Sequence, residues 1–488
     1  MESGNMKDQS FLHIGWQWMK GFPGKPLSQM EKFMAKANEI GVEDPRKVIH
    51  SMKVGLTITL VSLFYYFRPL YAEDFEVLSS MSTLMTVVAV FEFSVGATIG
   101  KILNSGLGTL VACGLGLAAR HLAHFAGRTY ESIILGTLVF IQAAATTYVR
   151  FFPKVKARYD HGATVFMLTF CLVSVSGFEM DEMVKWLQDR IVSVLLGATI
   201  CVMVSIIVFP VWAGEELHRL VARNMENLGS FMEDLEAKCF TASKEGDSRN
   251  GESFFVGLNH VIDSKTNLEN LVNFARWEPS HGQFRYFHPW KLYLKIGKLT
   301  SQCACRVELL NAYLNSTTQT PGDVTLPGAA TSKCPHSRVF NFRDSHKAPQ
   351  ELRATFQEAS SLLSLECGKA LKELAWSIDT MIKLPSPSRH VTNLTIASDN
   401  IKNLLNSDSW EGWADSSQTI LLVGVASLLT DIAFCVKTID EAVNKLGLLA
   451  TFAGKELNGN SPMKDRECLK HDHEILNHVV TVNEESVN

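Results

Sequence analysis

The chain has 488 residues, 46% of them apolar and 20% charged, and its formal net charge is −4. So small a charge for this length excludes the basic footprint of a nucleic-acid-binding protein. The average conceals a division, because residues 50–213 are far more apolar than residues 214–488. We therefore expect a membrane part followed by a soluble part. The ten cysteines include no CxxC pair, which favours free thiols in a reducing compartment.

We expect an all-α membrane protein with six transmembrane helices per subunit, followed by a cytosolic helical bundle. Each expected span approaches the ~20 residues that a helix needs to cross a hydrocarbon core. The alternative is six buried helices of a soluble core, but the fourth and sixth segments are too evenly apolar for it. The expected spans are residues 50–67, 79–100, 105–125, 130–149, 160–178 and 190–212.

The connections between these spans differ in charge from one side to the other. Basic residues precede the first span and fill the connection at 150–160, whereas the connections at 68–76 and 177–190 are acidic. Because positive residues hold the cytoplasmic side, both termini are predicted to be cytoplasmic. The N-terminal segment 1–48 lacks the continuous apolar core of a signal peptide.

Several cations lie within the spans or at their ends. Lys53 lies in the first span and Arg190 at the start of the sixth, and Arg150 and Lys154 lie at the inner end of the fourth. Charged residues in a span usually face the bundle interior or a watery path. These four cations face a single carboxylate in the spans, that of Glu92. Because the positive charge is in excess, we expect a path that selects anions. The alternative is that Lys53 and Arg190 reach the headgroups from helix ends.

Glu92 interrupts the apolar run VVAVFEFSVGATIGK at residues 87–101. It is either a proton-coupled group of a transporter or a structural counter-ion for a nearby Lys or Arg. Without a second carboxylate in the spans to relay a proton, the structural role is favoured. The glycines that follow, Gly96 and Gly100 and those of residues 106–119, are typical of close helix packing.

The soluble half has the apolar spacing of helices. Residues 419–452 are hydrophobic enough for a seventh span, but Asp431 and Lys437 interrupt them, which favours a buried bundle helix. We find no catalytic triad, metal cluster or nucleotide loop, so neither an enzyme nor a cofactor is expected. The expected domains are a cytosolic segment 1–48, a transmembrane domain 49–213, a cytosolic helical domain 214–455 with a disordered loop at 316–347, and a flexible tail 456–488.

The stretch RWEPSHGQFRYFHPW at residues 276–290 concentrates aromatic and polar residues, beginning with Trp277, Glu278 and Pro279. His281 and His288 suggest a metal site, but no third ligand stands at a recognisable spacing. Aromatic anchoring between the membrane base and the bundle is the favoured interpretation.

Five ordered segments resemble the plant aluminium-activated malate transporter family. They are EDPRKVIHSMKVG (43–55), MTVVAVFEFSVGATIGKILNSGLGTL (85–110), YVRFFPKVKARYD (148–160), FPVWAGEELH (209–218) and ARWEPSHGQFRYFHPWKLY (275–293).

The resemblance implies a homodimeric anion channel, with one pore on the dimer axis, that passes malate and inorganic anions by electrodiffusion. It places the pore cations at Lys53, at the basic stretch with Arg150 and Lys154, and at Arg190, with Met85 as an apolar constriction. It also implies the lipid bilayer of the plasma membrane or, as the alternative, the vacuolar membrane. The rival functions are a proton-coupled organic-anion carrier using Glu92 and a membrane-anchored scaffold.

The resemblance further implies extracellular aluminium as an activator. Its ligands would be acidic residues of the two outer loops, Glu73, Asp74 and Asp181. Ser105 stands where the family usually has arginine, a loss that would either weaken the affinity for anions or change the selectivity among them.

Overall fold

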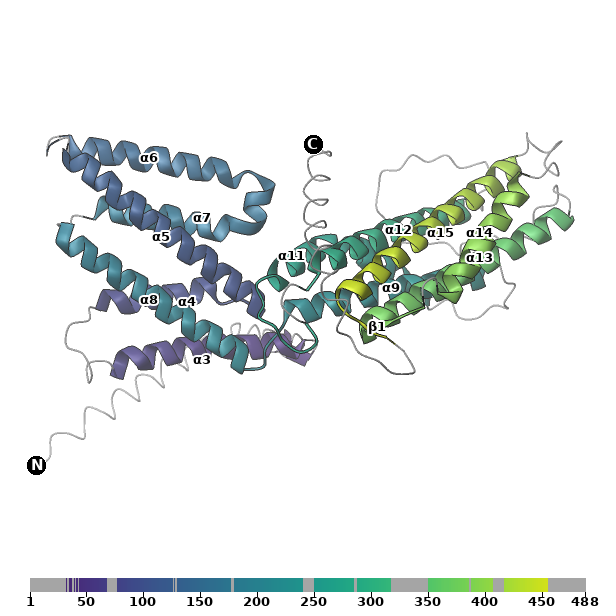
Figure 1. The fold of residues 1–488 in the computed structure, drawn as a ribbon, viewed down its shortest axis with the longest axis horizontal. Helices are drawn as coiled ribbons and strands as arrows, with labels where there is room; N and C mark the ends of the chain where they lie inside the picture. Colours follow the sequence, from purple (N-terminus) through teal and green to yellow (C-terminus); the bar gives the residue numbers. More distant parts are fainter. Residues whose placement is uncertain are drawn as a thin grey trace, which may run out of the picture. The chain divides into compact units, whose positions relative to one another are not determined.

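The computed structural model describes residues 44–67, 77–125, 130–176, 180–239, 250–284, 288–316, 350–385, 388–406 and 417–454, with a few isolated positions besides. The chain divides into two compact units, an N-terminal unit, Met1–Val211, and a C-terminal unit, Trp212–Asn488 (Figure 1). Most of the predicted segment 1–48, the predicted loop beyond residue 316 and the predicted tail 456–488 lie outside the described residues.

The N-terminal unit is built from helices that pack as two groups of three (Figure 1). One group contains α3, α4 and α8, the other contains α5, α6 and α7, and α5 and α8 join them. The proline at position 153 opens α7 at its first turn, where a missing N–H is tolerated. The helices are α3 (Pro45–Phe67), α4 (Val77–Val90), α5 (Val95–Phe125), α6 (Glu131–Arg150), α7 (Pro153–Val175) and α8 (Met180–Ile207).

The chain turns back at residues 91–94, between α4 and α5, whereas we expected a span over 79–100 and the next connection near 101–104. Our placement of this reversal was wrong. Thr98 Oγ1 accepts from the backbone N–H of Glu92 (3.0 Å), and Ser94 Oγ accepts from the N–H of Ala97 (3.3 Å). Ser94 thus caps the first turn of α5 and Thr98 holds the backbone of the turn, so the aromatic residues of the turn extend the apolar run without extending the helix.

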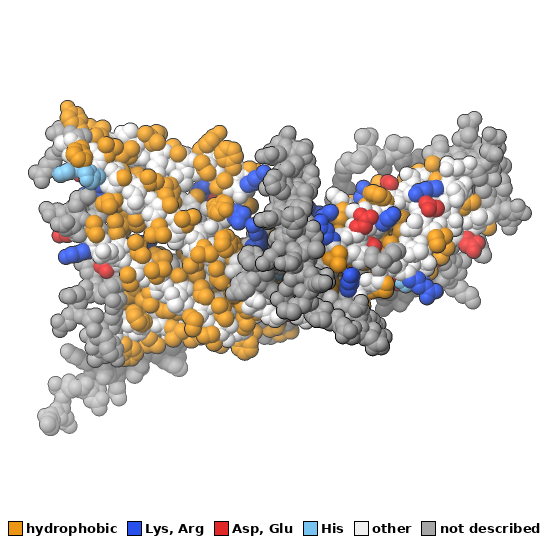
Figure 2. Space-filling view, viewed as in Figure 1, with side chains coloured by type: hydrophobic (Ala, Val, Ile, Leu, Met, Phe, Trp, Pro, Cys, Tyr) orange, Lys and Arg blue, Asp and Glu red, His pale blue; other side chains and the backbone are white. Residues whose placement is uncertain are grey.

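Side chains of the N-terminal unit are distributed as in a protein dissolved in lipid. Large apolar residues cover its outside (Figure 2), and many of its buried positions hold small or hydroxyl-bearing residues, beside valines such as Val61 and Val87. Many hydroxyls bond the carbonyl four residues earlier in their own helix, so they are satisfied without water. Examples are Thr57, Thr59, Thr86, Thr137, Thr164, Ser193 and Thr199.

Five described helices are long and apolar enough to cross a membrane: Pro45–Phe67, Val95–Phe125, Glu131–Arg150, Val184–Ile207 and Leu422–Leu449. The segment Met81–Val90 is apolar but shorter. Helix α7 is long enough to cross a membrane but not apolar enough. The structure therefore bears out an all-α membrane protein, while the count of six spans stays a prediction.

The C-terminal unit is a bundle of long helices around one apolar core. In it α9 packs on α13, α12 on α15, and α14 on both α13 and α15. A two-residue parallel pairing joins Ile382–Lys383 to Ala453–Gly454. The elements are α9 (Ala213–Cys239), α10 (Asn250–Asp263), α11 (Lys265–Ala275), α12 (Trp290–Ser316), α13 (Gln350–Thr380), β1 (Ile382–Lys383), α14 (Arg389–Leu405), α15 (Ser417–Leu449) and β2 (Ala453–Gly454).

The hydrophobic helix α15 belongs to this bundle. Half of its most apolar window is buried inside the unit, against 6% for α6. Ala426, Leu429 and Ile432 are all fully buried in the shared core, so α15 satisfies its apolar residues by packing against other helices.

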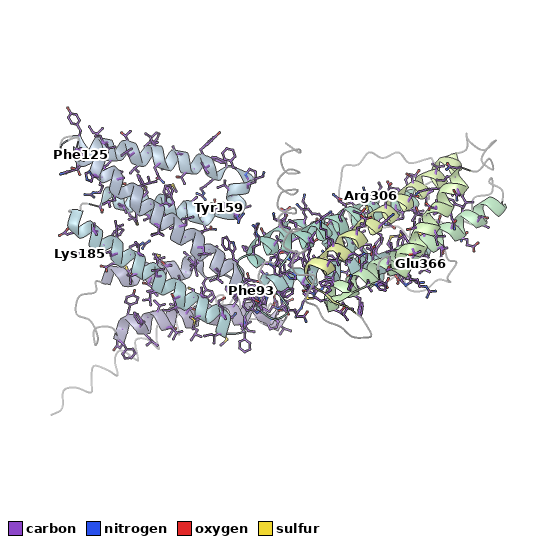
Figure 3. All side chains as sticks on the ribbon, viewed as in Figure 1. Phe93, Phe125, Tyr159, Lys185, Arg306 and Glu366 are labelled. Atoms are coloured by element: carbon purple, nitrogen blue, oxygen red, sulfur yellow. The ribbon has the colours of Figure 1, made fainter. Side chains whose placement is uncertain are left out.

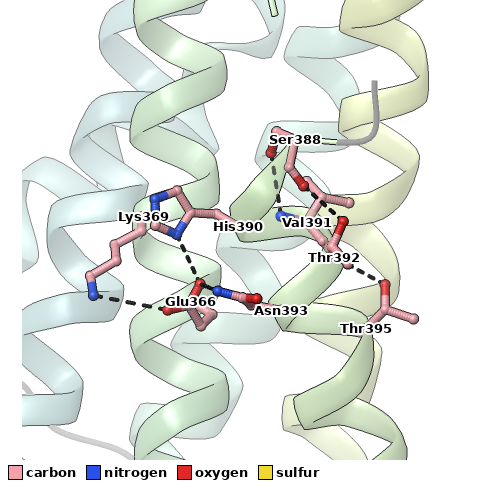
Figure 4. Close-up of polar contacts among 8 residues, drawn as sticks. All are labelled: Glu366, Lys369, Ser388, His390, Val391, Thr392, Asn393 and Thr395. Atoms are coloured by element: carbon pink, nitrogen blue, oxygen red, sulfur yellow. Dashed lines mark hydrogen bonds and ion pairs between the residues drawn. The ribbon is translucent and has the colours of Figure 1, made fainter. Parts of the chain in front are cut away.

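A polar network fastens α13 to α14 (Figure 4). The buried carboxylate of Glu366 accepts from His390 Nδ1 (2.8 Å) and Asn393 Nδ2 (3.3 Å), and Lys369 Nζ lies 3.9 Å away. Ser388 caps α14, because its Oγ accepts from the N–H of Val391 (3.3 Å).

Candidate functional site

Lys53 is buried in α3, with only 2% of its surface exposed. Its ammonium donates to the backbone oxygen of Phe209, just beyond α8, at 2.7 Å. Phe209 has a positive φ of 42°, a conformation that a bulky side chain rarely adopts. A buried ammonium needs an acceptor, and this carbonyl supplies one, so Lys53 joins the start of α3 to the end of α8.

Arg190 lies in the first half of α8 and donates through one terminal nitrogen to Ser82 of α4. Its Nε is buried and meets no hydrogen-bond partner among the described residues. Thr83, the residue after Ser82, has its Oγ1 2.5 Å from Tyr65 Oη and donates to the carbonyl of Ser193 (3.3 Å). The guanidinium of Arg190 therefore bonds a neutral serine hydroxyl and keeps a buried N–H without a partner among the described residues.

Arg150, the last residue of α6, makes a two-pronged pair with Asp160 of α7. Its Nε donates to Oδ1 at 2.7 Å and its NH2 to Oδ2 at 3.1 Å. Lys154, in the first turn of α7, is exposed. Reasoning from sequence missed Asp160, although opposite charges at the two ends of RFFPKVKARYD were a usable signal.

Glu92 lies in the α4–α5 turn at an end of the helices, and its carboxylate pairs with Lys101 of α5. Each of the two side chains is about one-third exposed. The turn is also covered by His50 of α3, whose ring lies 5.8 Å from that of Phe91 and 5.4 Å from that of Phe93 (Figure 3 labels Phe93). The partner of Glu92 is thus a cation of its own hairpin and not Lys53, Arg150 or Arg190.

These charges form a belt at one end of the N-terminal unit, where α3, α5 and α7 begin and α4, α6 and α8 end. His50 is within electrostatic reach of Lys53 and Glu92, and His161 within reach of Lys101, Glu92 and Asp160. We call this set the turn-side cluster. Its members are His50, Lys53, Glu92, Lys101, Arg150, Asp160 and His161.

The predicted pore cations therefore do not converge on one point. Lys53 contacts the carbonyl at the far end of α8, and Arg190 lies roughly 25 Å back along that helix, at 1.5 Å per residue. Lys53 and Arg190 therefore mark two ends of the unit. Arg150 lies at the same end as Lys53, because both belong to the turn-side cluster.

Met85 is 72% exposed on α4, and Met81 and Val88 are 65% exposed on the same face, which makes an apolar stripe at helical spacing. Asp181 lies in the first turn of α8, but its side chain is outside the described residues, as are Glu73 and Asp74. Within the described part of the chain, no group of three or more His, Cys, Asp or Glu residues is placed to hold a metal ion.

A scan against known families matches residues 38–413 to the model described as "Aluminium activated malate transporter". This chain belongs to the aluminium-activated malate transporter family. The match begins shortly before α3 and extends beyond α14. The family is one of transporters, in agreement with the expectation that the chain is not an enzyme.

Curated relatives agree with this assignment. The chain is 40% identical over 461 residues to aluminum-activated malate transporter 2 of Arabidopsis thaliana, covering 93% of this chain and 86% of the relative. It is 37% identical over 428 residues to aluminum-activated malate transporter 1 of Triticum aestivum, covering 87% of each. A more divergent relative, aluminum-activated malate transporter 12 of Arabidopsis thaliana, is 35% identical over 354 residues, 72% of this chain and 58% of the relative.

In this member of the aluminium-activated malate transporter family, Glu278 caps a helix 64 residues before it. Its carboxylate accepts from the backbone N–H groups of Ala213 (2.6 Å) and Gly214 (3.0 Å), the first residues of α9, and its side chain is 1% exposed. A carboxylate at a helix N-terminus satisfies free donors and complements the helix dipole. The rings of Trp212 and His281 stack beside it at 3.8 Å.

Sequence reasoning identified Trp277, Glu278 and Pro279 but missed this cap, because nothing local connects residue 278 to residue 213. Trp277 and Pro279 are half-buried, and the Pro279 carbonyl accepts from His281 Nδ1 (2.9 Å). The motif thus fixes the start of α9 through Glu278, and the expected aromatic anchoring between the membrane base and the bundle stays a prediction.

His218, Tyr293 and His288 form a buried polar link between α9 and the start of α12. His218 Nε2 donates to the carbonyl of Asp379 (3.3 Å), so its Nδ1 accepts from Tyr293 Oη (2.9 Å), whose oxygen accepts from His288 Nε2 (3.4 Å). Burial lowers the pKa of His218 and lowers that of His288 to about 4, and it raises the pKa of Tyr293. All three groups are therefore neutral at pH 7.

Proposed function

We propose that this chain is a passive anion channel that conducts malate and inorganic anions across a plant membrane. The printed names of its relatives supply the substrate class. The physical support comes from the N-terminal unit, in which cations are retained within or beside apolar helices. Such charges are costly in lipid and are kept where they face a path for ions.

Arg190 is the observation that carries the proposal. A buried guanidinium is always charged, and it is costly to bury unless its donors are satisfied. In the described part of the chain Arg190 bonds only a neutral hydroxyl, and its Nε is left without a partner. A permeating carboxylate accepts from such a donor at short range, where the local dielectric strengthens the attraction.

The turn-side cluster supports entry of anions at the other end. Its two carboxylates are both taken up in pairs, Glu92 with Lys101 and Asp160 with Arg150. Lys53 and the nearby exposed Lys154 remain as cations outside those pairs. The excess of positive charge raises the local concentration of anions.

We infer that two subunits complete the pore, with the apolar stripe of Met81, Met85 and Val88 facing the partner copy. Large exposed apolar patches mark contacts with other chains or with lipid, and Met85 is the centre of this one. We place the channel in the plasma membrane with both termini cytoplasmic, and aluminium as an outside activator at Glu73, Asp74 and Asp181. Bi-ionic recordings of malate against chloride, with and without aluminium outside, test both selectivity and activation.

Charge reversal at Arg190 tests the conduction path. Arg190→Glu is expected to lower malate currents at least tenfold in oocytes with surface expression unchanged, since a factor of ten is only about 1.4 kcal/mol. Lys185→Glu is the matched control, because Lys185 is exposed on the same helix. Unchanged current in Arg190→Glu would remove Arg190 from the path.

The rival is a proton-coupled carrier that uses Glu92. It predicts saturating flux and a reversal potential that follows the proton gradient. The ion pair with Lys101 favours the structural role for Glu92, because it ties the carboxylate to a cation of the same hairpin. Glu92→Gln distinguishes the two: a folded protein that has lost only its proton dependence supports the carrier, and loss of folded protein supports the structural role.

A further inference from the structure

Two buried thiols face each other in the C-terminal unit, and neither has a role in the proposed transport. Cys303 of α12 is fully buried, Cys435 of α15 is 5% exposed, and the two side chains are hydrogen-bonded to each other. All the described cysteines are free. The two residues come from helices that are far apart in the chain and are joined here by packing.

The register of the two helices supports this pairing independently. A Cβ added at Gly424 of α15 would lie 2.7 Å from Tyr313 Oη of α12. Tyr313 follows Cys303 by ten residues, and Gly424 precedes Cys435 by eleven, so both contacts belong to one antiparallel register. The close approach at Gly424 means that the backbones run near each other, as a bond between two cysteine side chains requires.

The two thiols differ in reactivity. Arg306, one turn beyond Cys303 on α12 (labelled in Figure 3), contacts Cys435. The hydrogen bond from Cys303 and the Arg306 charge lower the pKa of Cys435 against the opposing effect of burial. The bond with Cys435 and burial raise the pKa of Cys303. Cys435 is thus the nucleophilic thiol at the edge of the core, and Cys303 is the resolving thiol behind it.

We propose that Cys303 and Cys435 form a reversible disulfide when a peroxide oxidises the C-terminal unit. The Cys435 thiolate attacks one peroxide oxygen, the O–O bond breaks, and hydroxide leaves, which gives a sulfenic acid at Cys435. The Cys303 sulfur then attacks the sulfenyl sulfur, the S–O bond breaks, and the thiol proton leaves with the hydroxyl group as water. Overall two thiols are oxidised and one hydrogen peroxide is reduced to two waters.

The crosslink would close a long loop of chain, which contains α13 and α14 as well as the segments around them. Closing a long loop restricts the unfolded state and so raises the stability of the unit. A third thiol, Cys367 of α13, is fully buried and within electrostatic reach of Cys303. Cys367 could compete with Cys435 for a disulfide bond with Cys303, so the experiment must distinguish these two linkages.

The test treats full-length protein in detergent with a graded series of hydrogen peroxide, followed by blocking of free thiols and mass spectrometry of non-reduced peptides. The expected product is a peptide pair linked through Cys303 and Cys435 that reductant separates. The unfolding midpoint of the oxidised protein should rise by roughly 5–15 °C. Cys305→Ser is the matched control, because Cys305 is exposed on the same helix and should leave the crosslink intact.

Cys303→Ala and Cys435→Ala should each abolish both the linked peptide and the rise in the midpoint. Alanine is chosen because a serine hydroxyl would be left unsatisfied in this core. If either variant does not fold, wild-type peptide mapping still decides the matter. A linkage of Cys303 to Cys367, or oxidation confined to Cys305, would overturn the proposal.

Discussion

The two units of this protein differ in what covers their outside. In the N-terminal unit the exterior is apolar, as at Phe140 of α6, which is 74% exposed, and the buried positions include Thr57 and Thr83. In the C-terminal unit a continuous apolar core includes Ile432 and Ile439, both fully buried. The same helical geometry thus serves two solvents, because lipid accepts apolar side chains while water drives them inward.

The contrast also separates helices of similar hydropathy. The most apolar window of α15 has a mean hydropathy of 1.8, above the 1.6 of α6, yet half of it is buried inside the unit. Hydropathy alone would assign both helices to the membrane. What distinguishes them is whether other helices of the same unit cover the apolar face.

The largest expected effect comes from one substitution made in both units. Phe140→Lys should disfavour membrane insertion of α6 by about 2.5–3.5 kcal/mol, because position 140 is near the middle of that helix. Phe434→Lys, at a residue 70% exposed on α15, should change stability by less than about 0.5 kcal/mol. Insertion efficiency and the yield of folded protein measure both, and equal losses would mean that α15 also meets lipid.

The next largest effect is expected where a glycine of the N-terminal unit allows two helices to pack closely. A Cβ at Gly108 of α5 would lie 2.5 Å from the carbonyl oxygen of Gly162 in α7, whereas one at Gly106 meets nothing within 4 Å. We expect Gly108→Ala to destabilise the unit by about 1–3 kcal/mol through overpacking, and Gly106→Ala to be tolerated. Thermal unfolding in detergent measures the difference. An intact Gly108→Ala protein would place α5 and α7 further apart than they lie here.

Removing the helix cap in the C-terminal unit should lower stability somewhat less. Glu278→Gln keeps the shape of the side chain but removes its charge and one of its two acceptors at α9. We expect a loss of about 1–2 kcal/mol. Hydrogen exchange at Ala213 and Gly214 should accelerate, whereas Glu215→Gln, at an exposed first-turn acid paired with Arg219, should leave it nearly unchanged. Equal exchange in both variants would refute the cap.

The most gradual expected effect is on the pH dependence of the C-terminal unit. Burial holds the pKa of His288 at about 4, below its ordinary value of 6.5, with the neighbouring His218 and His281 contributing. The unfolded chain therefore binds more protons between these values, so stability should fall as the pH drops from 6.5 towards 4. The slope is at most about 1.4 kcal/mol per pH unit. Unfolding midpoints across this range should show a shallower slope for His288→Gln, and an unchanged slope would assign the effect elsewhere.

Sequence periodicity predicted most of the N-terminal helices because length and apolarity are local properties. The expected spans 130–149 and 160–178 lie close to α6 and α7. The reversal at Glu92 was misplaced because Phe91, Phe93 and Val95 continue the apolar run through a turn. The signal that it lay at 91–94 was the polar pair Ser94 and Thr98, of which Ser94 caps α5 and Thr98 holds the turn.

Long-range partners were beyond prediction from one sequence. The bond from Lys53 to Phe209 and the cap of α9 by Glu278 join residues far apart in the chain. Residue type indicated that Lys53 and Arg190 required partners, but only the packed helices determine which group each one meets. The roles of these residues in conduction stay predictions.

The hydroxyls that bond back to their own helices give the N-terminal unit a property that its hydropathy hides. Thr57, Thr86 and Ser193 each donate to a carbonyl four residues earlier, so none depends on water for satisfaction. Rotation about a single side-chain bond redirects that donor, and a hydroxyl also accepts. Redirecting one of these donors therefore requires no change in the helix that carries it.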